Sequence, residues 1–267
     1  MFIHERLSLR AFLFLCLGVF GLLFYNSTAR AYTEKDVTGG GTIEGTVKWA
    51  GAIPEVSFFP IQKDIEVCGK EPKLSPRLII SNDGGVKNTV LYLANIQEGK
   101  KMAELPSTLT LDQVECQYEP HIYIVPVGAE FVMTTSDDTL HNIHMYGAAN
   151  YNLAFPVKGQ KIAKKLRKAG VVDVVCDAGH YWMSAEVHVV EHPYYTVTDK
   201  DGKFKLENVP PGTYKLTAWH EGWKEKEKKE KEGKIDKIMF SDPVIIEKEV
   251  KVTENAVLTV ELEISDK

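Results

Sequence analysis

Residues Val174–Met183 read VVCDAGHYWM, and the rest of the chain is best interpreted around them. A β-branched run ends at Cys176, a tight loop then carries His180 and Met183, and a second extended run begins near Glu186. A thiolate, an imidazole and a thioether so close together form a soft ligand set of the kind that selects copper. The segment therefore predicts one half of a metal site at the end of a β-strand.

A second histidine has to come from another strand, because a copper site with one thiolate and a weak axial thioether takes two imidazoles. The sequence offers Asp137–His144 (DDTLHNIH), which follows an extended run at Glu130–Thr134. His141 is the first candidate ligand. His144 is close enough in sequence to compete, but we interpret it as a side chain beside the site or exposed to solvent.

Over residues 106–192 these pieces resemble a cupredoxin, the family of type 1 copper proteins that includes plastocyanin, azurin and amicyanin. The resemblance rests on Val127-Gly128 with Val132, on the acidic turn before His141, and on the loop Cys176–Met183. It implies a Greek-key β-sandwich built around a single copper ion.

The resemblance also implies roles for individual residues. By position, the copper ligands are His141, Cys176, His180 and Met183, and the ion cycles between Cu(I) and Cu(II). Asn142, which follows the first ligand, is the residue expected to hold the ligand loop in place.

Three features differ from the family pattern. Three residues separate Cys176 from His180, where plastocyanin and amicyanin loops have two. Ser136 stands where the family often has asparagine, and His144 lies near the first ligand. The spacing also resembles the dinuclear copper loop of cytochrome oxidase subunit II, but that loop needs a cysteine at the position of Val172. We therefore expect a mononuclear site.

The N-terminus has the pattern of a secretory signal. Arg6 and Arg10 precede an uncharged apolar run over residues 11–25, and small residues lead to a cleavage site after Ala31. We therefore predict that residues 1–31 are a signal peptide and that the protein is periplasmic or secreted. An uncleaved membrane anchor is the alternative, although the run is short for a membrane span.

Composition excludes some classes of function. The chain has 267 residues, 44% of them hydrophobic and 26% charged, which is typical of a globular protein. Its formal net charge of −5 argues against a nucleic-acid-binding protein.

Three cysteines remain outside the predicted signal. If Cys176 binds copper, as the resemblance implies, then Cys68 and Cys116 are left. Because an oxidising compartment favours disulfides, we expect these two residues to be bonded to each other.

A second resemblance covers the flanks. Thr196–Phe204 (TVTDKDGKF) and Leu206–Tyr214 (LENVPPGTY) resemble the carboxypeptidase regulatory-like, or transthyretin-like, β-sandwich. That family opens with strands of the type found at Gly45–Val47 and Val90–Leu93, which both lie upstream of the copper region.

The cupredoxin segment, residues 106–192, is therefore predicted to interrupt a sandwich made of residues 40–105 and 193–267. Tandem β-domains that share strands are the alternative. Within the second part, residues 224–234 (KEKEKKEKEGK) are fully polar and are expected to form a charged loop or an extended hairpin tip.

The fold class expected for the chain is all-β. One short helix is predicted at Gln160–Ala169, a basic segment that ends at Gly170. Extended runs are predicted by their Val, Ile, Thr and Tyr content, and examples are Thr42–Trp49, Thr89–Ala94, His121–Val127, Glu130–Thr134, Val171–Cys176, Glu186–Val190, Thr213–Trp219 and Ala256–Ile264.

These features favour an electron carrier rather than an enzyme. Its partners would be redox proteins, such as a c-type cytochrome or an oxidoreductase, that dock at an exposed edge of a ligand histidine. No nucleic acid is expected, and a membrane only if the signal stays uncleaved. Copper storage or delivery with His144 and Met145 as extra donors, a small copper enzyme with an open coordination position, and an adhesion or carbohydrate-binding sandwich remain alternatives.

Overall fold

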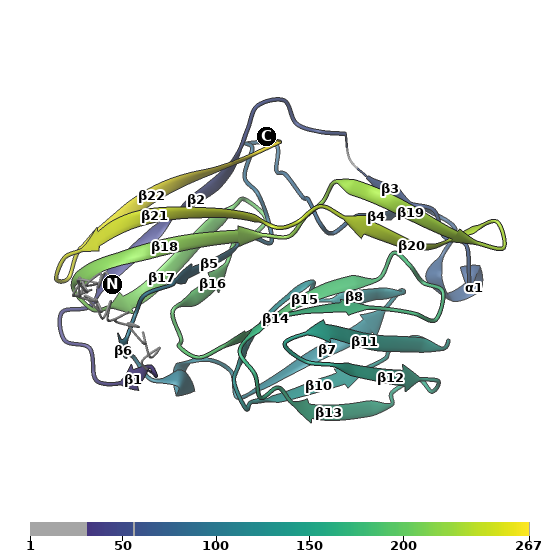
Figure 1. The fold of residues 1–267 in the computed structure, drawn as a ribbon, viewed down its shortest axis with the longest axis horizontal. Coiled ribbons are helices and arrows are strands. Elements are labelled where there is room, and N and C mark those ends of the chain that lie inside the picture. Colours follow the sequence, from purple (N-terminus) through teal and green to yellow (C-terminus); the bar gives the residue numbers. More distant parts are fainter. Residues whose placement is uncertain (1–30, 56, 267) are drawn as a thin grey trace, which may run out of the picture. The chain divides into compact units, whose positions relative to one another are not determined.

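The computed structural model describes residues 31–55 and 57–266, and these form almost entirely β-structure (Figure 1). The helical elements of this part are α1, Ile65–Cys68, and a 3₁₀ turn, Met102–Glu104. The described part contains no helix with the length and apolarity that crossing a membrane requires. The prediction of an all-β chain is confirmed, whereas residues 1–30 of the predicted signal lie outside the described residues.

The central part of the chain is a Greek-key β-sandwich with two sheets. One sheet has the strand order β13-β10-β7-β8 and the other β12-β11-β14-β15-β9. The strands are β7 Thr108–Val114, β8 Gln117–Glu119, β9 Ile122–Pro126, β10 Glu130–Thr134, β11 His141–Gly147, β12 Tyr151–Phe155, β13 Lys161–Lys165, β14 Gly170–Val175 and β15 Ser184–Val190. Buried side chains from both sheets, such as Phe131, Met133, Ile143 and Val174, form one core.

The flanks form a second β-sandwich. Its sheets have the orders β16-β5-β18-β21 and β17-β2-β22. The strands are β2 Gly41–Ala50, β5 Val90–Leu93, β16 Tyr195–Val197, β17 Lys203–Val209, β18 Gly212–His220, β21 Val244–Val252 and β22 Val257–Ser265. β2 and β5 therefore precede the central sandwich in the chain, and the other strands follow it. Ile43, Leu91, Leu216 and Leu262 lie in a separate core.

Not all of residues 40–105 belong to the core of the second sandwich. β3, Phe58–Phe59, pairs with β4, Lys73–Leu74, and α1 lies between them in the chain. Phe59 and Cys68 from this segment are buried in the core of the central sandwich. A further short pair joins β1, Thr33–Glu34, to β6, Glu98–Gly99.

The predicted helix at Gln160–Ala169 is wrong. The segment contains β13, which pairs antiparallel with β10 and places Ile162 opposite Met133. Burial alternates along β13, and Ile162 packs against the central core. Lysine and alanine are good helix formers, but helix propensity differs by less than about 1 kcal/mol per residue, so pairing with the edge of β10 outweighs that local preference.

The charged segment 224–234 is an extended hairpin rather than an open loop. Most of it is β19, Glu225–Lys231, which pairs with β20, Lys234–Phe240. Every residue of β19 is exposed, whereas Ile238 of β20 is buried against the central core. Ile238, together with the partly buried Ile235 and Phe240 on the same strand, thus anchors a hairpin whose first strand is polar throughout.

His188 on β15 makes the stability of the fold depend on pH. Burial lowers the pKa of this histidine to about 4, against a weaker opposing effect of the Glu221 charge. Between pH 6.5 and 4 the unfolded chain therefore binds a proton that the folded chain does not. We expect this residue to remove about 3 kcal/mol of unfolding free energy as the pH falls through that window.

The ring of His188 meets the ring of Trp219 edge-on at 4.5 Å, so His188→Phe is the matched variant. Urea unfolding at pH 7.5 and at pH 4.5 measures the effect. The variant should lose less stability than the wild type over this interval. Equal losses in both proteins would contradict the role assigned to His188.

Candidate metal centre

Three candidate ligands meet at one end of the central sandwich. β11 begins at His141 and runs antiparallel to β14, with His144 opposite Val175, so its first residue lies beside the loop that follows β14. That loop carries Cys176 and His180, and donor atoms of the three predicted ligands all lie within 4.8 Å of one another. All three side chains are buried.

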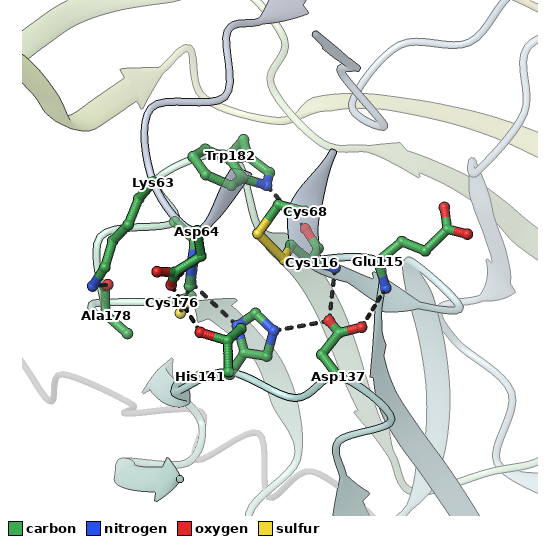
Figure 2. Close-up of a disulfide and its surroundings, with 12 residues drawn as sticks. Lys63, Asp64, Cys68, Glu115, Cys116, Asp137, His141, Cys176, Ala178 and Trp182 are labelled. Atoms are coloured by element: carbon green, nitrogen blue, oxygen red, sulfur yellow. Dashed lines mark hydrogen bonds and ion pairs between the residues drawn. A yellow bond between two sulfur atoms is a disulfide. The ribbon is translucent and has the colours of Figure 1, made fainter. Parts of the chain in front are cut away.

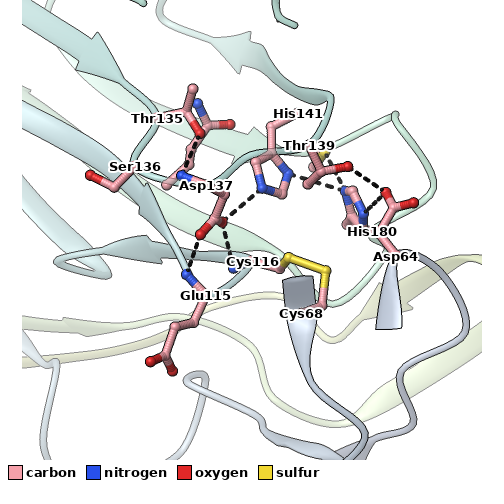
Figure 3. A network of polar contacts seen from close by, with 12 residues as sticks. Asp64, Cys68, Glu115, Cys116, Thr135, Ser136, Asp137, Thr139, His141 and His180 are labelled. Carbon is pink, nitrogen blue, oxygen red and sulfur yellow. Dashed lines mark hydrogen bonds and ion pairs between the residues drawn. A yellow bond between two sulfur atoms is a disulfide. The ribbon is translucent and has the colours of Figure 1, made fainter. Parts of the chain in front are cut away.

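The facing atoms are the ones a metal would need. The Nδ1 atoms of His141 and His180 are 3.2 Å apart (Figure 3). Cys176 Sγ is 3.6 Å from His180 Nδ1. Two imidazole nitrogens and a sulfur thus converge on one small volume. This donor set suits a soft or borderline transition metal such as copper.

Asp137 holds the outer nitrogen of His141. Its carboxylate accepts a hydrogen bond from His141 Nε2 at 2.8 Å and from the backbone N–H groups of Cys116 and Glu115 at 2.7 and 2.8 Å (Figure 3). Burial would raise the pKa of Asp137, but these donors outweigh it and lower the pKa. The sequence indicated only an acidic turn here, so this partner was missed.

Asp64 holds the outer nitrogen of His180 in the same way. His180 Nε2 is 2.9 Å from Asp64 Oδ2, which also accepts a hydrogen bond from Thr139 Oγ1 at 2.9 Å. Burial would raise the pKa of Asp64, but the hydrogen bonds from Thr139 and His180 lower it. Asp64 precedes the ligand loop by more than a hundred residues, and no local pattern marks it.

The metal-free site favours a thiolate beside a protonated imidazole. Burial would raise the pKa of Cys176, but hydrogen bonds with His141 and His180 lower it to about 6. Burial would likewise lower the pKa of His141, but hydrogen bonds to Asp137 and Cys176 raise it to about 9. The thiol therefore ionises readily, and a metal ion that binds would displace the imidazole proton.

Met183 completes the loop. Its backbone N–H donates to the carbonyl of His180 at 2.9 Å, which turns the chain back toward the sandwich. The methionine side chain is buried and belongs to the same apolar cluster as Cys176. The fourth predicted ligand thus lies in the same buried core as Cys176.

The other two predicted site residues lie on the opposite face of β11. Asn142 Oδ1 accepts a hydrogen bond from the N–H of Asp177 at 2.9 Å, so it is tied to the residue that follows Cys176. His144 contacts the carboxylate of Asp177 and the hydroxyl of Tyr146. Side chains an odd number of positions apart point to opposite faces of a strand. His144 therefore faces away from His141.

Cys68 and Cys116 are joined in a disulfide, as expected (Figure 2). The bond ties the last residue of α1 to the turn between β7 and β8. Its sulfur atoms and a ring nitrogen of His180 lie within 4.8 Å of one another. Trp182 of the ligand loop also donates from Nε1 to the carbonyl of Cys116 at 2.9 Å. The disulfide is therefore part of the wall of the site.

The expectation of an exposed ligand-histidine edge is wrong for His180. Its side chain is 0% exposed because Asp64 covers the outer nitrogen. The Asp64 side chain itself is 23% exposed. The carboxylate, not the imidazole, is the part of this arrangement that reaches solvent.

A cavity of about 190 Å³ lies on another side of the ligand loop. Cys176, Tyr181 and Trp182 line it from the loop, and Ile238 and Phe240 line it from β20. The charged hairpin thus covers a partly apolar space that reaches the cysteine.

In sequence, residues 172–264 match the family model of the carboxypeptidase regulatory-like domain. The match covers the strands of the second sandwich from β16 onward, and it begins inside β14, so it also includes the ligand loop. No curated protein matches the chain.

Among solved structures, the chain is similar to a purple cupredoxin from Nitrosopumilus maritimus, with 20% identity, 30% of this chain and 98% of that chain covered, and a TM-score of 0.27. A reduced amicyanin variant has 26% identity and a TM-score of 0.28, and the match covers 33% of this chain and 88% of that chain. The copper-containing nitrite reductase from Thermus scotoductus SA-01 has 18% identity and a TM-score of 0.29, and the match covers 33% of this chain and 23% of that chain. The structure comparison thus finds cupredoxins, and the family comparison finds a carboxypeptidase regulatory-like domain. The chain itself has an all-β fold with two sandwiches.

Proposed function

We propose that this chain is a mononuclear copper protein that carries single electrons between redox partners. The observation that carries the proposal is the buried convergence of His141, Cys176 and His180, with Met183 in the same loop. Copper bound there would take up and release one electron as it changes between Cu(II) and Cu(I).

The chain's own residues would prepare the site for that ion. The Asp137 carboxylate accepts a hydrogen bond from the Nε2–H group of His141, which directs Nδ1 of that ring toward the metal. Burial of Cys176 keeps water from its sulfur, and hydrophobic surroundings of this kind tune the potential of a copper–thiolate site. Little side-chain movement is then needed when the charge of the ion changes.

The proposed location is the periplasm or the exterior of the cell. The signal-like pattern of residues 1–31 supports it, and so does the disulfide, since disulfides persist in oxidising compartments. The partners in our proposal are other redox proteins, such as a c-type cytochrome or an oxidoreductase, that dock transiently.

Copper storage or delivery is less well supported. The two extra donors that would favour it, His144 and Met145, are neighbours on β11 and therefore point to opposite faces of the sheet. Met145 is buried in the core, whereas His144 contacts Asp177. These donors do not add to the cluster around Cys176.

A small copper enzyme is the second candidate. The cavity beside Cys176 favours it, because a small molecule could approach the site there. An electron carrier needs no open coordination position, whereas a catalytic metal does. Binding of a small anion that shifts the visible spectrum of the copper form would favour the enzyme over the carrier.

Copper titration of residues 32–267 tests the proposal together with two histidine variants. We expect one copper per chain and an intense thiolate-to-copper band in the visible spectrum. His141→Gln should lose both, because it removes a nitrogen that faces Cys176. His144→Gln should keep both, because His144 lies on the opposite face of β11.

His144→Gln is the matched control, since it makes the same chemical change three positions away on the same strand. Loss of copper in both variants would make His144 a ligand and contradict the assigned site. A wild-type protein that binds no copper would overturn the proposed function itself.

A further inference from the structure

A segment from outside the central sandwich crosses its ligand loop. We call residues 58–74, which run from β3 through α1 to β4, the strap. Lys63 Nζ donates to the carbonyl of Ala178 at 2.5 Å (Figure 2). The hydroxyl of Tyr181 donates to the carbonyl of Pro60 at 2.9 Å. The strap therefore forms hydrogen bonds with the ligand loop on both sides of His180.

The short helix of the strap is fixed at both ends. Asp64, at its start, has a left-handed backbone conformation with φ of 49° and accepts a hydrogen bond from Thr139. Cys68, at its end, is bonded to Cys116 of the central sandwich. The position of the Asp64 carboxylate is thus set by a covalent bond and a hydrogen bond, not by one surface contact.

The contact between Asp64 and His180 determines where the imidazole carries its proton. An ionised carboxylate only accepts hydrogen bonds, so His180 Nε2 has to be the N–H donor in the 2.9 Å contact. In the neutral imidazole Nδ1 is then the nitrogen without a proton, and it is the atom that faces Cys176 and His141. This is the tautomer in which His180 can bind a metal.

We propose that Asp64 is a positioning residue of the metal site, which holds His180 with Nδ1 toward Cys176 and closes the outer edge of the ring. The inference rests on the proposed copper site. Carboxylates that orient a ligand histidine typically contribute about 10–100-fold to metal affinity. Because His180 is covered, any electron exchange at this edge would pass by the Asp64 carboxylate and not by a bare imidazole.

Three variants separate orientation from charge. Asp64→Ala removes the acceptor, so copper affinity should fall roughly 10–100-fold, and copper should pass to a chelator faster than from the wild type. Asp64→Asn retains an oxygen acceptor but loses the charge, so release should stay closer to the wild-type rate while the reduction potential rises, because loss of a negative charge disfavours Cu(II). Asp138→Asn is the control, since it removes an exposed carboxylate near His141 that has no contact with His180.

Nitrogen-15 NMR of the metal-free protein gives a readout that needs no copper. Wild-type His180 should carry its proton on Nε2, and Asp64→Ala should shift the ring toward a mixture of tautomers. Unchanged copper release together with an unchanged His180 signal in Asp64→Ala would overturn the inference. If the wild type bound no copper, the proposed function would fail, whereas the NMR comparison would still decide whether Asp64 orients His180.

Discussion

The Cys176→Ser variant is expected to lose the visible band of the copper protein completely, while its fold survives. Serine is close to cysteine in size, so the buried position can accept it without a large cavity. A serine hydroxyl stays protonated where the thiol, whose pKa is lowered to about 6, is largely ionised near neutral pH. The variant therefore lacks both the soft ligand and the charge that balances the ion.

Copper affinity should fall by more than the roughly 10–100-fold that loss of an outer hydrogen-bond partner costs, because a direct ligand is removed. Absorption spectra and copper counts after dialysis at fixed free copper measure the change. Thermal unfolding of the metal-free proteins is the control and should be similar in both. A serine variant that keeps the band, or still accepts electrons from a donor, would rule out Cys176 as the electron-carrying ligand.

The local part of the site could be predicted from the sequence because its residues are close together in the chain. Cys176, His180 and Met183 lie on one loop, and His141-Asn142 opens one strand. Spacing along a strand and loop limits where such side chains can point. In the structure the donor atoms of His141, Cys176 and His180 lie within 4.8 Å of one another.

The other parts of the site and fold depend on contacts between residues far apart in the chain, which no local sequence pattern predicts. Asp64 reaches His180 only because the Cys68–Cys116 disulfide holds α1 against the central sandwich, and an isolated acidic residue before a one-turn helix carries no signal of that role. The exposed edge expected for His180 was wrong for this reason. The helix predicted at Gln160–Ala169 is wrong because the sequence does not show the edge of β10 with which residues 161–165 pair.

Glu221→Gln is expected to destabilise the protein strongly, because Glu221 is the centre of a buried charge cluster. Its carboxylate is 2.7 Å from Arg77 Nη1 and also contacts His121 Nε2, and its side chain is 1% exposed. Burial would raise the pKa of Glu221, but the charges of His121 and Arg77 lower it. The glutamate follows β18 of the second sandwich, and His121 precedes β9 of the central one.

Glutamine keeps the shape of the side chain but removes the nearer counter-charge of the largely buried Arg77 guanidinium and leaves only Glu186, 4.0 Å from Arg77 Nη2. Breaking a buried pair of this kind costs about 3–5 kcal/mol of unfolding free energy. Urea unfolding measures this loss. The matched control is Glu247→Gln, whose partner Lys215 lies 3.1 Å away with both side chains 51% exposed, and it should cost about 0–1 kcal/mol.

A double variant, Arg77→Met with Glu221→Gln, tests the cause. If the loss in Glu221→Gln comes from an uncompensated charge, removing the arginine as well should restore part of the stability, since the guanidinium that lost its nearer partner is then gone. Arg77 also stacks over the ring of Phe240 at 4.2 Å and donates to the Gly222 carbonyl, so recovery should be incomplete. Losses that simply add would instead mean that the two side chains stabilise the fold independently. Arg77 and Phe240 also line the cavity beside Cys176. A double variant that regains stability but has a weaker copper band than the wild type would therefore show that this cluster supports the metal site as well as the fold.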